Sequence, residues 1–271
     1  MMPKYLVFMD LDNTLLGSDH KHISVRTKAT IEKLQKHEVK FYISTGRMYE
    51  LAKITQNRLN PEVGMITSNG AVFDGINGQE VTLLGKKTVE EAYKVTHDRK
   101  LPMMLFTPDT AYFTEKIPHF IAQNAGNFDE AFGYHEIENF EELQKVAGII
   151  TNGVVLSRDN MDELDQVRKE LAATKLLRLS ASGPDNIEMI PLKTDKGTAI
   201  KKVQLETGVD KDHTFVFGDG MNDLGMMKQA HYSVAMGNAI PEIKETANFV
   251  TDSNVNDGIA TFLEAHFREL F

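Results

Sequence analysis

Both ends of this chain alternate short apolar runs with helical patterns. In the first third the strand-like runs are Tyr5–Met9, Val39–Ile43 and Gly64–Thr67, and helices are expected between them at Val25–His37 and Met48–Leu59. Strands joined by helices of this length pair in parallel through right-handed crossovers. The alternation therefore predicts an α/β domain built on a parallel sheet.

The last third returns to the same alternation. A helix over Lys196–Thr207 is expected to end at Gly208, because glycine is favoured just after a helix. Further expected elements are strands at Thr214–Phe217 and His231–Ala235 and helices at Met221–Gln229, Pro241–Ala247 and Gly258–Phe267. Residues 1–82 and 191–271 are therefore predicted to form one discontinuous domain.

The middle of the chain has a different pattern, in which pairs of short strand-like runs separate the helices. A capping-box pattern at Thr88–Glu91 predicts a helix to Arg99, and Pro108 is expected in the turn of a hairpin. The other expected elements are strands at Met103–Thr107, Ala111–Thr114, Leu176–Ala181 and Asn186–Ile190 and helices at Ile117–Ala125, Phe140–Val146 and Met161–Ala172. We therefore predict an inserted α+β domain over residues 83–190.

The composition of this 271-residue chain excludes several classes of protein. A net charge of −9, from 30 basic and 39 acidic residues, argues against a nucleic-acid partner, because phosphate backbones attract basic surfaces. The absence of cysteine excludes disulfides and thiolate nucleophiles and fits a cytoplasmic location. No apolar run approaches the roughly 20 residues that span a bilayer, so a soluble protein without a membrane partner is expected.

Two aspartates follow the first strand-like run directly, in Asp10-Leu-Asp12. A carboxylate there can attack phosphorus and form an acyl-phosphate, which makes Asp10 the candidate nucleophile. If the chain stays extended, Asp12 points the same way and can exchange a proton with the leaving group and with water. Taken alone, the pair is equally consistent with a solvated turn stabilised by local hydrogen bonds.

A second acidic pair, Asp219 and Asp223, follows a later strand in the sequence Gly-Asp-Gly-Met-Asn-Asp. The glycines permit a tight turn at the strand end. Carboxylate oxygens suit Mg²⁺, which bridges carboxylates and phosphate while it keeps several waters. The spacing does not match a calcium-binding EF-hand loop. The two strand-end pairs therefore predict one magnesium site, formed by Asp10, Asp12, Asp219 and Asp223.

Three further segments supply candidate phosphate ligands. Thr45, Gly46 and Arg47 lie between a strand and a helix, where a hydroxyl and free backbone N–H groups form an anion-binding corner. Asn69 follows the next strand, and Lys196 begins a helix, where its charge opposes the helix dipole unless phosphate and carboxylates surround it. Each segment alone is also explained by an ordinary helix cap, a hairpin turn or a surface lysine.

In this order, these segments resemble the four motifs of the haloacid dehalogenase (HAD) superfamily. Residues 10–14 are similar to motif I, residues 44–47 to motif II, Lys196 to motif III and residues 218–223 to motif IV. Residues 68–71, 235–239 and 257–258 are similar to segments of the Cof-type phosphatases in that superfamily. The resemblance covers the whole chain and implies a Rossmann-like core with an inserted cap domain.

The resemblance also implies a chemistry: Mg²⁺-dependent hydrolysis of small phosphomonoesters, such as sugar phosphates, through an aspartyl-phosphate on Asp10. In that family the metal ligands would be Asp10, the carbonyl of Asp12 and Asp219, with Asp223 close by. The phosphate would be held by the Leu11 backbone, Thr45, Gly46, Lys196 and Asn222. The expected partner is a small phosphorylated metabolite.

Two other functions remain open from the sequence. A phosphomutase or phosphotransferase would form the same aspartyl-phosphate and pass the phosphoryl group to a sugar hydroxyl instead of water. A non-catalytic protein that binds phosphorylated metabolites is disfavoured, because binding alone does not require the pair formed by Asp10 and Asp12.

Overall fold

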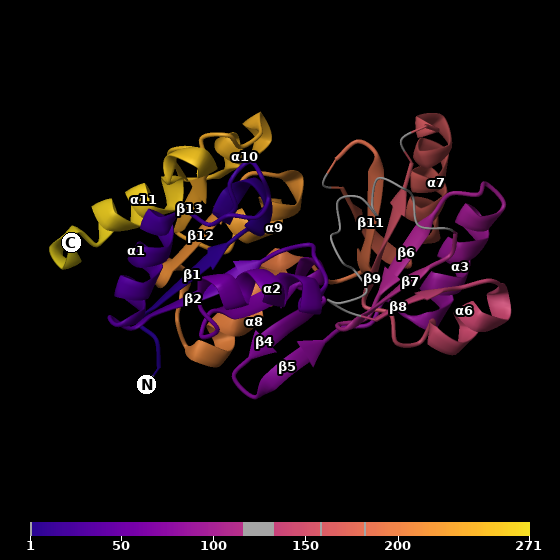
Figure 1. The fold of residues 1–271 in the computed structure, drawn as a ribbon, viewed down its shortest axis with the longest axis horizontal. Coiled ribbons are helices and arrows are strands. Elements are labelled where there is room, and N and C mark those ends of the chain that lie inside the picture. The colour runs from indigo at the N-terminus through magenta and orange to yellow at the C-terminus, as the bar shows by residue number, and fades with distance from the viewer. Residues whose placement is uncertain (1, 116–132, 158, 182) are drawn as a thin grey trace. The chain divides into compact units, whose positions relative to one another are not determined.

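The computed structural model describes residues 2–115, 133–157, 159–181 and 183–271 (Figure 1). Contacts divide the chain into two compact units. The first comprises Met1–Gly46, Ala52–Glu80 and Asp195–Phe271, and the second comprises Arg47–Leu51 and Val81–Thr194. Within the described residues no helix is long and apolar enough to cross a membrane. The helix expected at Ile117–Ala125 lies outside the described residues.

The first unit is built on an eight-stranded sheet of order β14-β13-β12-β1-β2-β3-β4-β5. The strands are β1 (Tyr5–Met9), β2 (Val39–Ser44), β3 (Gly64–Thr67), β4 (Val72–Gly75), β5 (Gly78–Val81), β12 (Thr214–Gly218), β13 (Tyr232–Ala235) and β14 (Phe249–Val250). From β14 to β3 every neighbouring pair is parallel, and β4 runs antiparallel to β3. The predicted α/β fold on a parallel sheet is confirmed.

Helices connect these strands, and most of them begin where the sequence predicts. They are α1 (Val25–Gln35), α2 (Tyr49–Leu59), α8 (Lys196–Thr207), α9 (Leu224–Met227), α10 (Pro241–Thr246) and α11 (Gly258–His266). The Ser24 hydroxyl caps α1 by accepting a hydrogen bond from the Thr27 N–H at 3.1 Å. Gly208 ends α8 in a left-handed conformation (φ 73°), as predicted. The expected helix Met221–Gln229 is instead a 3-10 turn over Met221–Asp223 followed by the short α9.

The central strands fix which chain segments meet at the edge of this sheet. Every residue of β1 from Leu6 to Met9 is fully buried, as expected for a strand covered on both faces. Strand β1 lies between β2 and β12, with Met9 opposite both Ile43 and Phe217. Because the three strands run in the same direction, the residues that follow them come together at one edge.

The second unit contains a six-stranded sheet of order β10-β11-β9-β6-β7-β8. The strands are β6 (Met103–Phe106), β7 (Thr110–Phe113), β8 (Gly133–Glu136), β9 (Asn152–Leu156), β10 (Leu177–Ser180) and β11 (Asn186–Pro191), and the described helices are α3 (Lys86–His97), α6 (Phe140–Val146) and α7 (Met161–Thr174). Strands β6 and β7 form the predicted hairpin. Strands β8 and β9 were not predicted, and β9 holds the sheet together between β6 and β11.

One predicted helix start in this unit is wrong. The capping-box pattern at Thr88–Glu91 predicts a helix that begins after Thr88, but α3 begins at Lys86. Gly85, in a conformation with φ 95°, turns the backbone into the helix before Thr88 is reached. Thr88 is therefore buried inside the first turn of α3.

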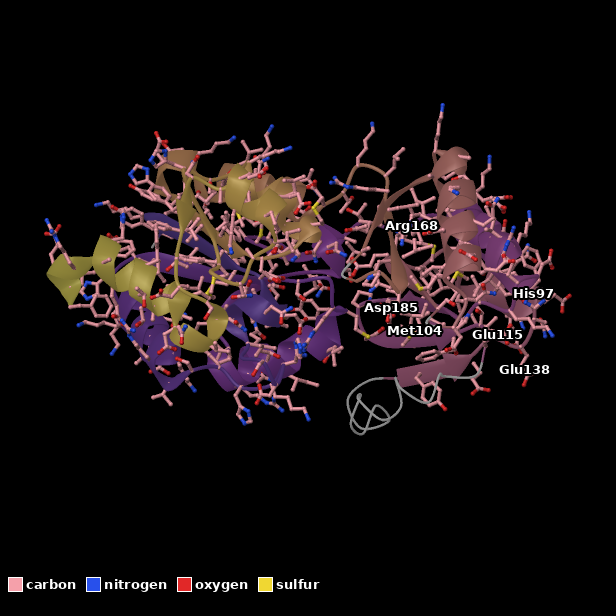
Figure 2. All side chains as sticks on the ribbon, turned by 90° about the horizontal axis from the view of Figure 1, so that it is seen from above. His97, Met104, Glu115, Glu138, Arg168 and Asp185 are labelled. Carbon is pink, nitrogen blue, oxygen red and sulfur yellow. The ribbon has the colours of Figure 1, made fainter. Side chains whose placement is uncertain are left out.

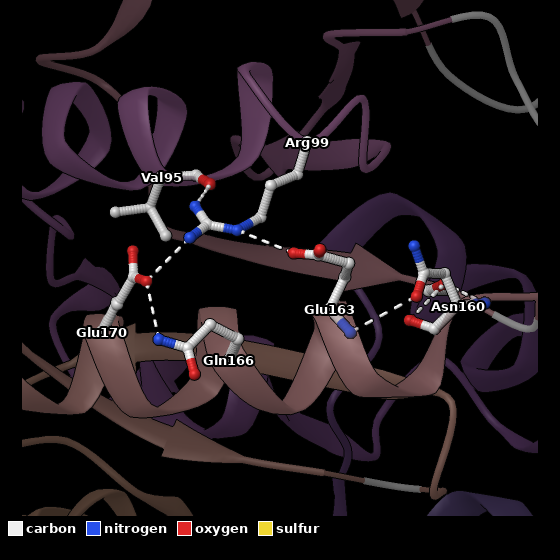
Figure 3. Close-up of polar contacts among 7 residues, drawn as sticks. Val95, Arg99, Asn160, Glu163, Gln166 and Glu170 are labelled. Carbon is white, nitrogen blue, oxygen red and sulfur yellow. Dashed lines mark hydrogen bonds and ion pairs between the residues drawn. The ribbon is translucent and has the colours of Figure 1, made fainter.

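A hydrogen-bond network around Arg99, which follows α3, connects the end of that helix to α7 in the second unit (Figure 3). The Arg99 guanidinium donates to the carboxylates of Glu163 at 2.9 Å and Glu170 at 2.7 Å and to the Val95 carbonyl at 2.7 Å. Helix α7 is fixed to the sheet in the same way, because Arg168 (Figure 2) donates to the carbonyl of Asn186 in β11 at 2.9 Å. Arginine suits such positions because its planar fork serves several acceptors at once.

We predict that Arg99→Met destabilises the second unit by about 1–2 kcal/mol, because it removes charge-assisted hydrogen bonds from a side chain that is only 25% exposed. Urea unfolding followed by circular dichroism measures the change. The control is Lys94→Met in α3, whose pair with Glu91 is solvent-exposed, and it should change stability by less than about 0.5 kcal/mol. Equal effects of the two substitutions would contradict the role of Arg99.

Candidate active site

The site is assembled at the edge of the first sheet, where β1 and β12 end side by side. Asp10 is the first residue after β1, and its N–H donates to the carbonyl of Phe217 in β12 at 2.9 Å. Gly218 then ends β12, and Asp219 begins the following loop. The strand register therefore places the two predicted acidic pairs next to each other.

Lys196 lies at the centre of this site and is fully buried. Its ammonium donates to Asp10 Oδ1 at 2.5 Å and to Asp223 Oδ1 at 2.7 Å. Helix α8 begins with Lys196, and its N-cap, Asp195, forms a reciprocal capping box with Thr198. The interpretation of Lys196 as a solvated surface residue is therefore wrong, because two carboxylates surround it.

The loop after β12 is closed by the second of its two aspartates. Asp223 Oδ2 accepts hydrogen bonds from the backbone N–H groups of Asp219 at 2.8 Å and Gly220 at 3.1 Å. A side chain on Gly218 would overlap the Asp223 carboxylate, so this position requires glycine. Thr14, from the wide turn Leu11–Leu15, donates to Asp219 Oδ1 at 2.9 Å. Asp219 is thereby fixed from the side of β1.

Asp10, Asp219 and Asp223 form a group that fits a divalent metal ion. Each offers one carboxylate oxygen, and these three oxygens lie within 4.8 Å of one another. When all are ionised, the three carboxylates and the Lys196 ammonium leave two uncompensated negative charges in a buried place. A hard dication with oxygen ligands, such as Mg²⁺, matches both the donor set and this charge.

Burial and neighbouring charges shift the pKa values of the acids and of the lysine in this site. Burial and the charge of Asp223 raise the pKa of Asp10 well above its usual range, although Lys196 partly opposes the rise. Burial and Asp223 also raise the pKa of Asp219, to about 6. For Lys196 burial alone would lower the pKa, but the charges of Asp10 and Asp223 outweigh it and raise the pKa above its usual range. Lys196 therefore stays cationic.

Asp12 lies beside this group and has a different partner. Its backbone is extended (φ −78°, ψ 130°), but its carboxylate is not among the three clustered oxygens. Asp12 Oδ1 is 3.2 Å from Nδ1 of His20, and His20 itself adopts a left-handed conformation (φ 54°). Asp12 is more exposed than Asp10, so it is accessible to a substrate and to water.

Two of the predicted phosphate-binding segments meet at the ends of β2 and β3. The Asn69 N–H donates to the Thr45 carbonyl at 3.0 Å, and a side chain on Gly46 would press against the Asn69 amide. Asn69 also sits in the turn between β3 and β4, so the interpretation as a hairpin turn is correct as well. Gly70 (φ 93°) lets this turn approach the backbone of Asp195, next to Lys196.

The remaining predicted residues are distributed around these segments. Leu11 is buried in the wide turn after β1, and Asn222 is half-buried in the 3-10 turn that contains Asp223. Arg47 belongs to the second unit, unlike Thr45 and Gly46. The structure therefore brings the acids, Lys196 and the Thr45–Asn69 corner into one unit and assigns Arg47 to the other.

Sequence reasoning missed two contacts at this edge. His20 was not predicted, because its contact with Asp12 depends on a hairpin that pairs Leu16 with Ile23. Asn238 donates to the carbonyl of Asn13 at 2.8 Å and so fixes the turn after Asp12. The segment of Asn238 is part of the resemblance to the Cof-type phosphatases, but no local pattern indicates its partner 225 residues away.

We predict that divalent-cation binding weakens as the pH falls below about 6. A carboxyl group whose pKa is raised keeps its proton to higher pH, and that proton competes with the cation. Asp219 alone, with a pKa of about 6, makes the apparent Kd for Mg²⁺ about tenfold weaker at pH 5 than at pH 7. Isothermal titration calorimetry measures this dependence.

The matched variant for this pH dependence is Thr14→Val. The Thr14 hydroxyl lowers the pKa of Asp219 by donating to it, so its loss should move the weakening of Mg²⁺ binding to higher pH. A profile that does not move, or a wild-type affinity that is constant from pH 5 to pH 7, would contradict the assignment.

We also predict that Lys196→Met strongly destabilises the metal-free protein. It leaves buried Asp10 and Asp223 without their cation, which costs about 3–5 kcal/mol. Thermal unfolding in EDTA and in Mg²⁺ measures the loss, and the metal should restore part of it. Lys202→Met, at an exposed position of the same helix, should change stability by less than about 0.5 kcal/mol. A small effect of Lys196→Met in EDTA would disprove the compensation.

Comparisons with known proteins agree with this geometry. The chain is 29% identical over 257 residues to a 5-amino-6-(5-phospho-D-ribitylamino)uracil phosphatase of Bacillus subtilis. The aligned region covers 94% of this chain and 92% of the relative. It is 28% identical over 249 residues to an HMP-PP phosphatase of Serratia proteamaculans. Here the aligned region covers 88% of this chain and 86% of the relative.

Among solved structures, a haloacid dehalogenase-like hydrolase from B. subtilis superposes with a TM-score of 0.85 at 24% identity, covering 96% of this chain and 99% of that one. The shared fold therefore extends over nearly the whole chain. The haloacid dehalogenase-like hydrolase family matches residues 7–263, and the chain therefore belongs to that family.

Proposed function

We propose that this protein is a Mg²⁺-dependent phosphatase that hydrolyses small phosphomonoesters through an aspartyl-phosphate on Asp10. The observation that carries the proposal is the buried Lys196 ammonium, 2.5 Å from Asp10 Oδ1 and 2.7 Å from Asp223 Oδ1. Lys196 thus joins the acid at the end of β1 to the acid in the loop after β12, in a place where both are buried. Family membership and relatives named phosphatases support the same chemistry.

In the first half-reaction a carboxylate oxygen of Asp10 attacks the phosphorus of the substrate. The bond from phosphorus to the ester oxygen breaks, and Asp12 gives its proton to the leaving alcohol. The extended backbone of Asp12 and its accessibility support this assignment. Lys196 keeps Asp10 from repelling the incoming phosphate, because its positive charge lies against the attacking group.

In the second half-reaction water replaces the alcohol. Asp12, now a carboxylate, takes a proton from the water that attacks phosphorus, and the bond to Asp10 breaks. Inorganic phosphate leaves, and both aspartates return to their starting state. The two acids therefore have separate tasks: Asp10 carries the phosphoryl group, and Asp12 moves the protons.

We assign the metal site to Asp10, Asp219 and Asp223, with the carbonyl of Asp12 as a further ligand. When bound, Mg²⁺ would neutralise charge on the acids and on the phosphoryl oxygens. The chain's own phosphate ligands in this proposal are the Leu11 backbone, Thr45, Gly46, Arg47, Asn69, Lys196 and Asn222. The corner formed by Thr45, Gly46 and Asn69 supports this assignment, because these residues lie together after β2 and β3.

We propose sugar phosphates and phosphorylated sugar alcohols as the substrate class. The Bacillus subtilis relative is named for a substrate with a phosphorylated ribityl group, which supports this class. We assign residues 83–190 to a cap domain and residues 1–82 and 191–271 to the core. The contact-defined units divide the chain at nearly the same places, apart from the short segment Arg47–Leu51.

We predict that Asp10→Asn lowers the release of p-nitrophenolate from p-nitrophenyl phosphate by about a thousandfold or more, because the amide cannot act as the nucleophile. The assay is run with purified protein in saturating Mg²⁺. The Asp212→Asn variant, at an exposed position before β12, makes the same change of charge and should leave turnover unchanged. If the wild type is no faster than Asp10→Asn on this ester and on a panel of sugar phosphates, the proposal fails.

Asp12→Ala is expected to separate the two half-reactions. p-Nitrophenolate leaves without a proton, so phosphorylation of Asp10 proceeds, while hydrolysis of the aspartyl-phosphate slows by about 10²–10⁴-fold. Stopped-flow absorbance should then record a burst of one p-nitrophenolate per protein molecule, and acid quenching should trap the phosphoprotein. Loss of Mg²⁺ binding in parallel with turnover would contradict the role of Asp12. Adding sugar acceptors to this assay also distinguishes hydrolysis from phosphoryl transfer.

A further inference from the structure

A basic hollow of about 460 Å³ opens on the first unit, and none of its lining residues belongs to the site described above. It is lined by Lys21, His22, Ile23, Lys28 and Arg58. No carboxylate is among these lining residues, although the chain as a whole carries a net charge of −9. Surface cations in an acidic protein are usually paired or dispersed, so a basic hollow without an acid indicates a site for an anion.

The cationic side chains of this hollow retain hydrogen-bond donors that no described residue uses. The Lys28 ammonium donates one hydrogen bond, to the Arg58 carbonyl at 2.9 Å, and retains two further N–H groups. The side chains of Lys21 and Arg58 form no ion pair with any residue that the structure describes. His22 is paired with Asp19, outside the lining. Lys21, Lys28 and Arg58 therefore place three permanent charges around one volume that no carboxylate of the described residues lines.

Three separate parts of the chain supply these residues. Lys21, His22 and Ile23 lie in the hairpin that pairs Leu16 with Ile23, whereas Lys28 lies in α1 and Arg58 in the last turn of α2. The hairpin is closed by hydrogen bonds of its own, such as that from the Gly17 N–H to the His22 carbonyl at 2.9 Å. Like charges on three elements repel one another, and a shared anion reverses that repulsion.

We propose that this hollow binds a small anion that carries two or more phosphate groups and that the anion ties the Leu16–Ile23 hairpin to α1 and α2. The volume lies within the range of small-molecule pockets. The guanidinium of Arg58 suits bidentate binding to phosphate, and the two lysines supply point charges. Ile23 is the sole apolar side chain of the lining, and no Phe, Tyr or Trp lines it, so we expect recognition of the phosphates rather than of a base.

Binding here would act on the turn that contains Asp12 through the same hairpin. His20 lies in the hairpin, one residue before Lys21, and its Nδ1 is 3.2 Å from Asp12 Oδ1. An anion that restrains Lys21 and His22 therefore also restrains His20 beside Asp12. The proposed site is an accessory anion site, separate from the acids that hold the metal.

The test uses tripolyphosphate as the probe and isothermal titration calorimetry in EDTA, so that the metal site contributes no affinity for the anion. Ionic strength is kept at about 0.01 M, where the Debye length is about 30 Å and charge interactions are weakly screened. Wild type is expected to bind one tripolyphosphate. The variant Lys28→Gln/Arg58→Gln is expected to bind about a hundredfold more weakly, since each lost charge-assisted contact is worth about tenfold.

Two further variants separate this site from general charge effects. Lys169→Gln/Lys201→Gln removes the same charge from exposed helix positions outside the hollow and should bind as the wild type does. Lys21→Gln changes only the exposed hairpin, so it keeps the contact between Lys28 and α2 and should weaken binding about tenfold. This variant tests the site even if the double substitution impairs folding.

Hydrogen–deuterium exchange provides the structural readout. Tripolyphosphate should slow exchange in residues 16–23 of the wild type and have no such effect in Lys28→Gln/Arg58→Gln. The proposal is overturned if the wild type fails to bind, if Lys169→Gln/Lys201→Gln weakens binding as much as the substitutions in the hollow, or if exchange in residues 16–23 does not change. The assay contains no substrate and no metal, so its outcome is independent of the proposed phosphatase activity.

Discussion

The buried ammonium of Lys196, held between Asp10 and Asp223, is the interaction on which the site depends. Three carboxylates in a buried place repel one another, and without a cation they would take up protons or destabilise the fold. Lys196 removes enough negative charge to let Asp10 and Asp223 approach, but it leaves two charges uncompensated. Lys196 therefore makes the group stable enough to fold, and the two remaining negative charges allow it to bind a divalent metal.

The parallel sheet provides the rigid frame for this arrangement. Asp10, Thr45 and Asp219 each come just after a strand, and β2, β1 and β12 are neighbours that run in the same direction. The acids are therefore positioned by backbone hydrogen bonds between buried strands, while Asp223 and Thr14 fix the loops that follow. Catalytic groups placed in this way depend on the register of the strands, which the fully buried side chains of β1 hold fixed.

Much of the fold and of the site could be predicted from local patterns. The strand over Gly64–Thr67 and the helix over Lys196–Thr207 were predicted with the bounds that the structure shows, because their apolar runs end at turn residues. The prediction at Thr88 failed, since Gly85 turns the chain into the helix earlier than the capping pattern suggests. Strand β9 was missed because its position between β6 and β11 is fixed by pairing with distant strands, which no local pattern reveals.

The sequence by itself determined the classes of element, the acidic pairs at two strand ends and the lysine at a helix start, because short-range periodicity and turn chemistry are local properties. Only the tertiary structure decided which of these residues contact one another and which are buried. It buried Lys196 against two acids, kept the carboxylate of Asp12 out of the metal group beside His20, and gathered Lys21, Lys28 and Arg58 around one hollow. These relations join residues far apart in the chain, and their energies depend on burial and distance, which exist only after folding.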